Sequence, residues 1–529
     1  MFRILVELFI SLALVANMAG VVPAYSAELS EQALRGKRIY VGGESESGSP
    51  INAIVSSGGT AISASILPCV GCHGNDGKGR PEGGVVPSDI TWNKLTASYG
   101  HEHNYGRSHP AFDERSVAAA VIAGIDPANN ALDAAMPRYD ISETDMADLI
   151  VYLQHIEDDF DPGLTSDTIR IGSILPMQGS LQGLGLAMKQ VLDACFADVN
   201  ASGGIHGRNI ELVVAEYKPD AAQSAWQVRD LLQQESVFAM VSGYAAGIET
   251  DVAQLAEELE VPMIGPHTQL PQEGNGLDRH SFYLLGGLIQ QAAVLARHRV
   301  SERKGGNRQI AVVRPVGQIY DLALERVQAE LGAQGETVSE ALMYQPPFFD
   351  ATDVAQVLSE KGIDTVLFFG QAPDLKRLAS KASELDWRPD LLLPGVFADA
   401  RMFEISEQFA GRVFVAYSST PSDHSARGIE AFEKLHSDHG IDYQHSTAQI
   451  SAYVAAEVLV ESLKRAGREL SREKLLTALE SLADFQAGLM PPISYNRSRR
   501  IGALGAYVVE LDLERKSFVA ASNWVALQR

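Results

Sequence analysis

The stretch ILPCVGCHGNDGKGR (66–80) holds two cysteines separated by two residues, with a histidine directly after the second one. Cys-x-x-Cys-His is the pattern of covalent haem attachment, because the two thiols add to the haem vinyl groups and the adjacent His73 is held where it can ligate the iron. A zinc site or a redox-active cysteine pair would need further ligands at zinc spacing or a βαβ context, and neither accompanies this stretch. We therefore expect one haem c, attached to Cys69 and Cys72.

A second iron ligand is predicted 63 residues beyond His73, in AAMPRYDIS (134–142). The thioether of Met136 opposite His73 would give a six-coordinate iron of raised potential, with no open position for oxygen or peroxide chemistry. Bis-histidine ligation is the alternative, and four further histidines compete for the position: His101, His103, His109 and His155. Arg107 and Trp92 are candidates for contact with a haem propionate. An iron with all six positions occupied favours one-electron transfer over enzymatic chemistry at the haem.

Residues 28–160 resemble a class I cytochrome c domain. The resemblance rests on CVGCHGNDGKG, then MPRY, then a helix predicted over 142–156 with Ser142 as its cap, and further helices are predicted near 29–39 and 115–123. It implies His73 and Met136 as axial ligands and Cys69 and Cys72 as thioether attachments. The block carries 9 Lys and Arg against 19 Asp and Glu, a net charge of −10, which suits docking to a basic redox partner.

The first 27 residues, MFRILVELFISLALVANMAGVVPAYSA, read as a secretory signal peptide, with an uncleaved membrane anchor as the alternative. Export to the periplasm agrees with haem attachment, which takes place outside the bacterial cytoplasmic membrane. The formal net charge of −24 argues against nucleic acid as a partner. The third cysteine, Cys195, falls on an apolar helical stripe and is expected to be a buried core residue.

The segment EDDFDPGLTSD (157–167) breaks the helical pattern, and we expect a linker over 161–168. From residue 169 onward, short apolar runs alternate with amphipathic helical ones; the predicted strands are 169–175, 210–217, 237–243, 261–266, 310–316, 365–370, 391–397 and 413–418. This alternation is typical of parallel sheets covered on both faces, and its length favours two doubly wound lobes over one sheet. The predicted fold is thus a small all-α cytochrome c domain followed by a two-lobed α/β domain over 169–529.

The second part resembles the type I periplasmic solute-binding proteins, the receptors of branched-chain amino acid and amide importers. The similar segments include the opening IRIGSILPMQGS, the turn GGIHGR (203–208), VPMIGPHTQ (261–269), GQIYDLAL (317–324) and RRIGALGAYVVEL (499–511). The resemblance implies a solute held between two lobes. It makes six residues candidate solute contacts: Tyr244, His267, Thr268, Gln269, Tyr320 and Gln371.

Two loops depart from the pattern of amino acid receptors. GYAAGIET (243–250) lacks the expected run of hydroxyl residues, and LPGVFAD (393–399) lacks an early acidic residue to bind an amine, with Asp399 coming late. These departures argue against an α-amino acid and leave a carboxylate, an amide, an alcohol-derived compound or an aromatic solute. The sequence favours an electron carrier tethered or coupled to solute binding, in a setting such as periplasmic alcohol oxidation; the alternative is the receptor of an ABC importer, docking to its permease.

Overall fold

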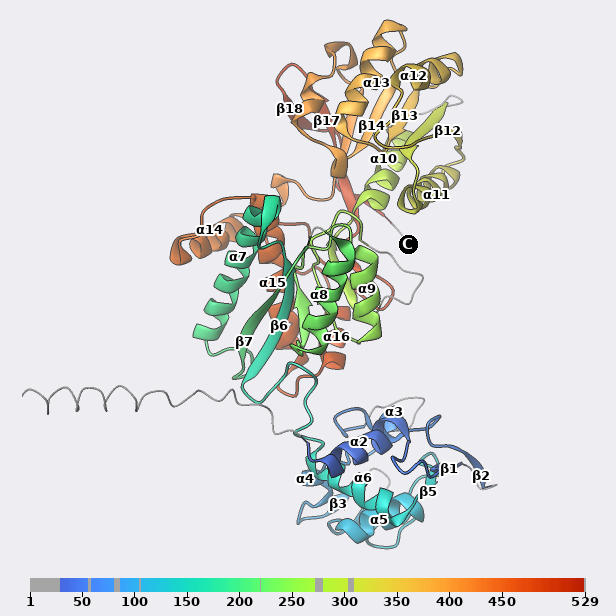
Figure 1. The fold of residues 1–529 in the computed structure, drawn as a ribbon, viewed down its shortest axis with the longest axis vertical. Helices are drawn as coiled ribbons and strands as arrows, with labels where there is room; N and C mark the ends of the chain where they lie inside the picture. Colours follow the sequence, from blue (N-terminus) through green and yellow to red (C-terminus); the bar gives the residue numbers. More distant parts are fainter. Residues whose placement is uncertain are drawn as a thin grey trace, which may run out of the picture. The chain divides into compact units, whose positions relative to one another are not determined.

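The computed structural model describes residues 29–55, 59–79, 86–103, 106–218, 220–271, 279–302 and 309–527. The chain divides into two compact units, 1–160 and 161–529 (Figure 1). The predicted signal peptide, residues 1–27, lies outside the described residues. Among the described helices, none combines the length and apolarity that a membrane span requires.

The first unit is mainly helical. Its helices are α2 (Glu31–Gly42), α3 (Cys69–His73), α4 (Trp92–Leu95), α5 (Glu114–Ile122) and α6 (Glu143–His155). Ser142 caps α6 as predicted, accepting a hydrogen bond from the Asp145 amide. The expectation of an all-α unit is incomplete, because β1 (Asn52–Val55) pairs antiparallel with β2 (Thr60–Ser63) and β5 (Arg138–Asp140), and β3 (His101–Glu102) pairs with β4 (Ser108–His109).

Helices α2 and α6 cross at Gly36. A β-carbon at this position would lie 2.0 Å from the Asp148 carbonyl oxygen, so only glycine allows the two backbones to approach this closely. Arg35 beside it donates to the buried Asp148 carboxylate at 2.7 Å. One turn away, the rings of Tyr40 and Tyr152 pack with their centres 5.3 Å apart. The crossing is therefore the centre of this unit's core.

Residues 161–167, within the predicted linker, pack against the second unit. Leu164 is only 3% exposed, and the Gly163 carbonyl accepts a hydrogen bond of 2.7 Å from the Arg170 amide. The Asp161 carboxylate accepts one of 2.6 Å from the amide of Arg472. The segment is thus ordered by contacts that its acidic, Pro- and Gly-containing sequence does not reveal.

The first lobe of the second unit is a six-stranded parallel sheet in the order β16-β10-β9-β8-β6-β7. Its strands are β6 (Thr168–Leu175), β7 (Asn209–Glu216), β8 (Ala239–Val241), β9 (Met263–Ile264), β10 (Ser281–Leu285) and β16 (Ile501–Ala503). The helices of this lobe are α7 (Gln182–Ala201), α8 (Ala221–Gln233), α9 (Glu249–Glu258), α14 (Ala426–His439), α15 (Ser446–Ala466) and α16 (Arg472–Glu480). Cys195 lies buried on α7, as expected.

The second lobe is built on an eight-stranded sheet in the order β12-β11-β13-β14-β15-β17-β18, with β19 paired to β17. Its strands are β11 (Ile310–Pro315), β12 (Val338–Tyr344), β13 (Thr365–Phe368), β14 (Asp390–Pro394), β15 (Val413–Tyr417), β17 (Gly505–Asp512), β18 (Ser517–Ala520) and β19 (Val525–Ala526). The strands from β12 to β15 run parallel, and β17 is antiparallel to β15.

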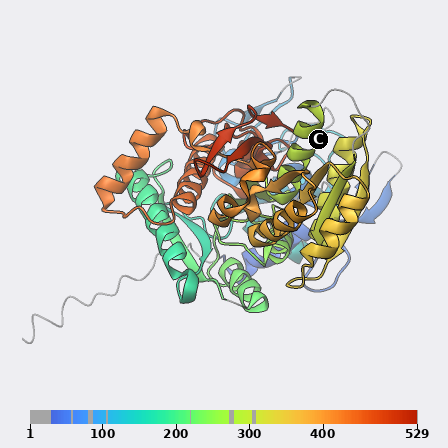
Figure 2. The same cartoon turned by 90° about the horizontal axis from the view of Figure 1, so that it is seen from above.

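Helices cover both faces of this second sheet: α10 (Leu288–Glu302) and α11 (Gln318–Gly332) lie on one side, α12 (Ala351–Glu360) and α13 (Ala372–Glu384) on the other (Figures 1 and 2). Successive side chains of β13 pack into two different hydrophobic cores. Val366 and Phe368 pack on the side covered by α12 and α13, and Leu367 packs on the side covered by α10 and α11. This explains why the strand is apolar throughout and has no polar alternation.

The chain passes between the lobes three times, at 286–287, 418–425 and 504. Two of these passages are joined by a hydrogen bond of 2.5 Å from the Ser418 hydroxyl to the Gly286 carbonyl. Gln291 donates to the same hydroxyl at 3.1 Å and accepts from the Val396 amide. The lobes are therefore connected by short paired segments, an arrangement that permits hinge motion.

Candidate functional site

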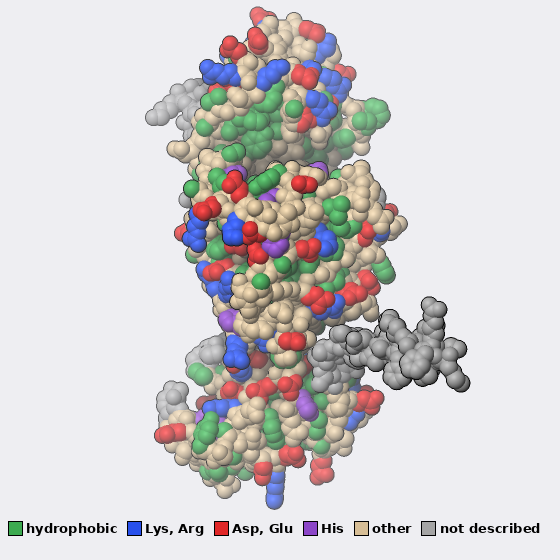
Figure 3. Space-filling model, turned by 90° about the vertical axis from the view of Figure 1, so that its left-hand side faces the viewer, with side chains coloured by type: hydrophobic (Ala, Val, Ile, Leu, Met, Phe, Trp, Pro, Cys, Tyr) green, Lys and Arg blue, Asp and Glu red, His purple; other side chains and the backbone are tan. Residues whose placement is uncertain are grey.

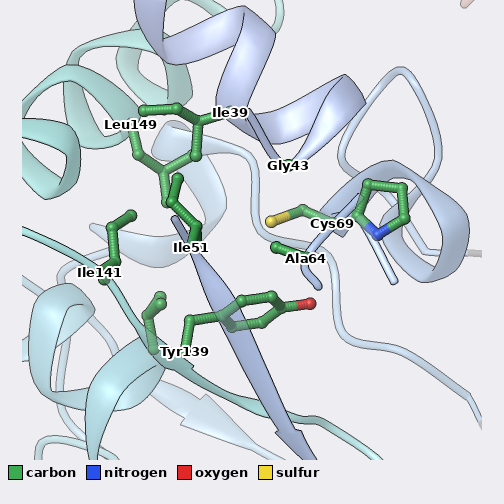
Figure 4. A pocket seen from close by; sticks show the side chains of 10 residues that line it. Ile39, Gly43, Ile51, Ala64, Cys69, Tyr139, Ile141 and Leu149 are labelled. Atoms are coloured by element: carbon green, nitrogen blue, oxygen red, sulfur yellow. The ribbon is translucent and has the colours of Figure 1, made fainter. Parts of the chain in front are cut away.

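Helix α3 places both motif cysteines and His73 in little more than one helical turn. Cys69 and Cys72 are three positions apart and so share one side of the helix. The Cys69 sulfur points into an apolar pocket lined by Ile39, Gly43, Ile51, Ala64, Pro68, Val121, Tyr139, Ile141 and Leu149 (Figure 4). Burial raises the pKa of the Cys69 thiol to about 12.

His73 is oriented by a carbonyl 15 residues away. Its Nδ1 lies 2.9 Å from the Ser88 carbonyl oxygen. Because a carbonyl can only accept, Nδ1 carries the proton and Nε2 presents its lone pair. Burial lowers the pKa of His73, which also favours the neutral, ligating imidazole. Sequence reasoning found His73 but had no signal for Ser88.

These residues fit a covalently bound haem. The two thiols stand at the spacing for thioether attachment, the bare imidazole Nε2 follows at once, and the apolar lining around Cys69 suits a macrocycle. The tyrosine side chains of Tyr139 and Tyr40 fasten the backbone on either side of the motif, donating to Leu67 O at 2.8 Å and Gly74 O at 2.6 Å.

Met136 lies in a turn before β5 that is held by Arg138. One guanidinium nitrogen donates to the Met136 carbonyl and the other to the Leu132 carbonyl at 3.1 Å. The Arg138 side chain packs against Gly124, where a β-carbon would overlap it. Met136 itself is half-buried. The arginine therefore sets the shape of the segment that presents the predicted thioether ligand.

Three of the alternative histidine ligands pack on one another at the β3–β4 hairpin. The Nε2 atoms of His103 and His109 are 2.9 Å apart, and the ring centres of His101 and His109 are separated by 5.1 Å. Burial lowers the pKa of His103. Within the described ranges, no group of three or more His, Cys, Asp and Glu side chains is arranged to hold a metal ion.

The remaining candidates around the haem site have ordinary structural surroundings. Arg107 pairs with the buried Asp126 carboxylate at 3.1 Å. Trp92 packs half-buried on the core of the first unit, and His155 is exposed in the last turn of α6.

In the second unit, two predicted solute contacts come together at the carboxyl edge of the first lobe's sheet. Tyr244 follows β8 and His267 follows β9; their rings are stacked with centres 6.1 Å apart. Tyr217 packs edge-on against Tyr244 at 4.8 Å. Burial lowers the pKa of His267 and raises those of both tyrosines. The carboxyl edge is where open α/β sheets bind ligands.

A glutamate that sequence reasoning missed completes this group. The Glu249 carboxylate, in the first turn of α9, accepts hydrogen bonds from the Gly247 amide at 2.8 Å and the Thr268 hydroxyl at 3.0 Å. The predicted contact Gln269, which follows Thr268, has an exposed side chain. The backbone carbonyl of Gln269 accepts a hydrogen bond from the Leu288 amide. A signal existed in the sequence, since an acidic residue in the first turn of a helix is a common anion position.

The second lobe contributes a separate aromatic pair. Tyr320, in the first turn of α11, stacks on Phe397 with ring centres 6.4 Å apart, and burial raises its pKa. Gln371 is the N-terminal cap of α13 and is exposed. Asp399 caps a short 3-10 turn and forms an ion pair with Arg401. The Asp399 carboxylate is thus engaged by its own loop and by Arg401.

Comparison with known proteins agrees with both parts of this description. Residues 62–157 match the cytochrome c family, and residues 168–517 match the family described as periplasmic binding protein. The chain belongs to the periplasmic binding protein family and carries a cytochrome c domain in front of it. Both resemblances predicted from the sequence are therefore confirmed.

Relatives and solved structures are distant. The Leu/Ile/Val-binding protein BraC3 of Rhizobium johnstonii is 23% identical over 318 residues, which are 59% of this chain and 83% of the relative. A fatty acid ABC transporter substrate-binding protein from Thermomonospora curvata matches with a TM-score of 0.53 at 19% identity, covering 70% of this chain and 95% of its own.

A branched-chain amino acid ABC transporter structure from Thermus thermophilus with bound valine matches with a TM-score of 0.54 at 16% identity. The match covers 69% of this chain and 98% of the Thermus chain. At these identities the structures show the two-lobed fold.

Proposed function

We propose that this protein is an exported electron carrier whose larger unit binds a small solute. The observation that carries the proposal is the geometry of His73, whose Nδ1 is committed to the Ser88 carbonyl while Nε2 is left as a ligand beside the two thiols. A haem c held by Cys69 and Cys72 would supply one-electron redox chemistry, with Met136 as the sixth ligand. A periplasmic location and a periplasmic redox partner follow from this role.

The axial ligand is tested by matched methionine substitutions in the full-length haem-loaded protein. Met136→Leu should abolish the weak red absorption of a thioether–iron(III) bond and lower the reduction potential. Met146→Leu is the control, because Met146 is a buried core residue of α6. An unchanged spectrum in Met136→Leu would favour the bis-histidine alternative.

The surface of the first unit suits docking to a basic partner. Its acidic excess predicts electron-transfer rates that fall as ionic strength rises. On the face shown in Figure 3, acidic and basic side chains are interspersed over the second unit. Charge steering is proposed for the cytochrome unit on the basis of its net charge of −10.

Solute binding by the second unit is supported by its fold and by the aromatic groups that each lobe places at a sheet edge. Tyr244 and His267 stand on one lobe, and Tyr320 and Phe397 on the other. Stabilisation of the second unit by a solute, seen as a rise in its unfolding temperature, tests this role. If no amino acid, amide, short acid, amine or alcohol raises it, the solute-binding proposal fails.

The receptor of an importer is the second candidate function, and the names of the relatives and structures favour it. The two functions differ in what removal of the protein does. Loss of solute uptake in a deletion strain, restored by a Cys72→Ala variant without normal haem attachment, would identify the importer role. Loss of substrate-dependent respiration, for example on an alcohol, would identify the electron-transfer role.

A further inference from the structure

The Glu249 carboxylate accepts hydrogen bonds from a backbone amide and a hydroxyl at the aromatic edge of the first lobe. The N-terminus of a helix with free amides is a natural site for a carboxylate. Here the Gly247 amide donates to one oxygen of Glu249 and the Thr268 hydroxyl donates to the other, at 2.8 and 3.0 Å. The chain's own carboxylate thus engages these two donors.

The Thr268 hydroxyl has no donor capacity left for a solute. Its oxygen accepts a hydrogen bond of 2.9 Å from the Leu270 amide, and its proton is directed to Glu249. A hydroxyl has a single proton. Thr268 therefore fixes Glu249 and does not serve as a donor to an anionic ligand.

The electrostatics of this edge oppose a second negative charge. Glu249 is the charged neighbour that acts on Tyr217 and Tyr244, and it raises the pKa of both beyond the effect of burial. His267 beside them is held toward its neutral form by burial. A solute carboxylate placed against these rings would meet like charge with no cationic side chain of this group to offset it.

The same arrangement favours a hydrogen-bond donor on an aromatic body. Glu249 keeps acceptor capacity on its two oxygens, since a carboxylate offers about four lone-pair sites. The stacked Tyr244 and His267 provide flat faces, and tyrosine faces also attract cations. A β-carbon added at Gly247 would be in ordinary van der Waals contact with the Tyr217 hydroxyl at 3.9 Å, so this edge is not tightly packed there.

We infer that the second unit selects an aromatic solute that carries an amine or a hydroxyl and no carboxylate, with Glu249 as the specificity-determining residue. The inference rests on the proposed solute-binding function and names its substrate class. It also gives a physical reason for the departure of the loop 243–250 from the pattern of amino acid receptors.

The test uses the full chain and a matched series of benzylamine, benzyl alcohol, benzoate and valine. Benzylamine or benzyl alcohol should raise the unfolding temperature of the second unit, and benzoate and valine should not. Glu249→Gln keeps an oxygen for the Gly247 amide but removes the charge; it should weaken benzylamine binding about tenfold or more and admit benzoate. Glu258→Gln is the control, since it removes the same charge from the far end of α9.

Salt dependence of the wild type provides a measurement that needs no variant. Benzylamine affinity should fall with ionic strength and benzyl alcohol affinity should not. Binding of benzoate or valine by the wild type would overturn the inference while leaving the solute-binding function intact. If none of the four compounds binds, the inference is overturned. If no compound of the wider solute screen binds either, the proposed solute-binding function is refuted as well.

Discussion

Replacing Arg138 by glutamine should loosen the turn that carries Met136. The guanidinium donates to the Met136 and Leu132 carbonyls, and its side chain fills the space beside Gly124. Glutamine is shorter, uncharged and able to preserve at most one of these contacts. The variant therefore weakens the support of the ligand-bearing segment without altering any proposed haem ligand.

The size of the effect follows from the hydrogen bonds that are lost. A hydrogen bond from a charged donor contributes about 1.5–3 kcal/mol, and the half-exposed position of Arg138 favours the lower end. A net loss of about 2 kcal/mol in the closed turn increases the open population roughly 30-fold, because about 1.4 kcal/mol corresponds to a factor of ten.

Displacement of the methionine by an external ligand measures this opening. Imidazole binds ferric haem only when the sixth position is vacated, so its apparent affinity should rise roughly 30-fold in Arg138→Gln. Arg115→Gln is the control, because Arg115 lies exposed on α5 and its substitution removes the same charge from the same unit. Equal imidazole affinity in the two variants would refute the positioning role of Arg138.

Three further variants test the fold around the two sites. Gly36→Ala should destabilise the first unit by about 2–3 kcal/mol in denaturant unfolding, since its methyl group would overlap α6, whereas Gly42→Ala at the open end of α2 should be nearly neutral. Arg472→Lys should lower the unfolding free energy of the second unit by about 2–4 kcal/mol, because one guanidinium serves three carbonyls that a lysine cannot all reach. His436 is buried, and burial lowers its pKa. As the pH falls below about 6.5, the unfolded chain therefore binds this proton before the folded one does, and the free energy of unfolding should decrease. His436→Asn should reduce this pH dependence, measured by thermal melts at about pH 5 and 7.

Much of the fold was predictable because its signals are local. The cap of α6, the apolar strands and the cysteine spacing all lie within a few residues of the features they determine. The strands β10, β12 and β16 to β19 and the small sheet of the first unit were not predicted. Some of their pairing partners lie far along the chain, as in the matches of Tyr283 with Ile501 and of Asn52 with Asp140.

The candidate sites divide in the same way. The sequence predicted His73, Met136, Tyr244 and His267, since each belongs to a short motif or follows a recognisable strand. It did not predict Glu249 as a filled anion position, because that role depends on a hydroxyl brought from the next loop.

By itself the sequence determined the two-part organisation, the covalent haem motif and the two-lobed parallel architecture, all of which follow from spacing and periodicity along the chain. Only the tertiary structure decided which nitrogen of His73 is bonded to the backbone, what holds the Met136 turn and which carboxylate lies at the aromatic edge. The reason is physical: a hydrogen bond depends on atoms meeting in space, and residues 15 to 19 positions apart, as in the pairs His73–Ser88 and Glu249–Thr268, meet only once the chain has folded.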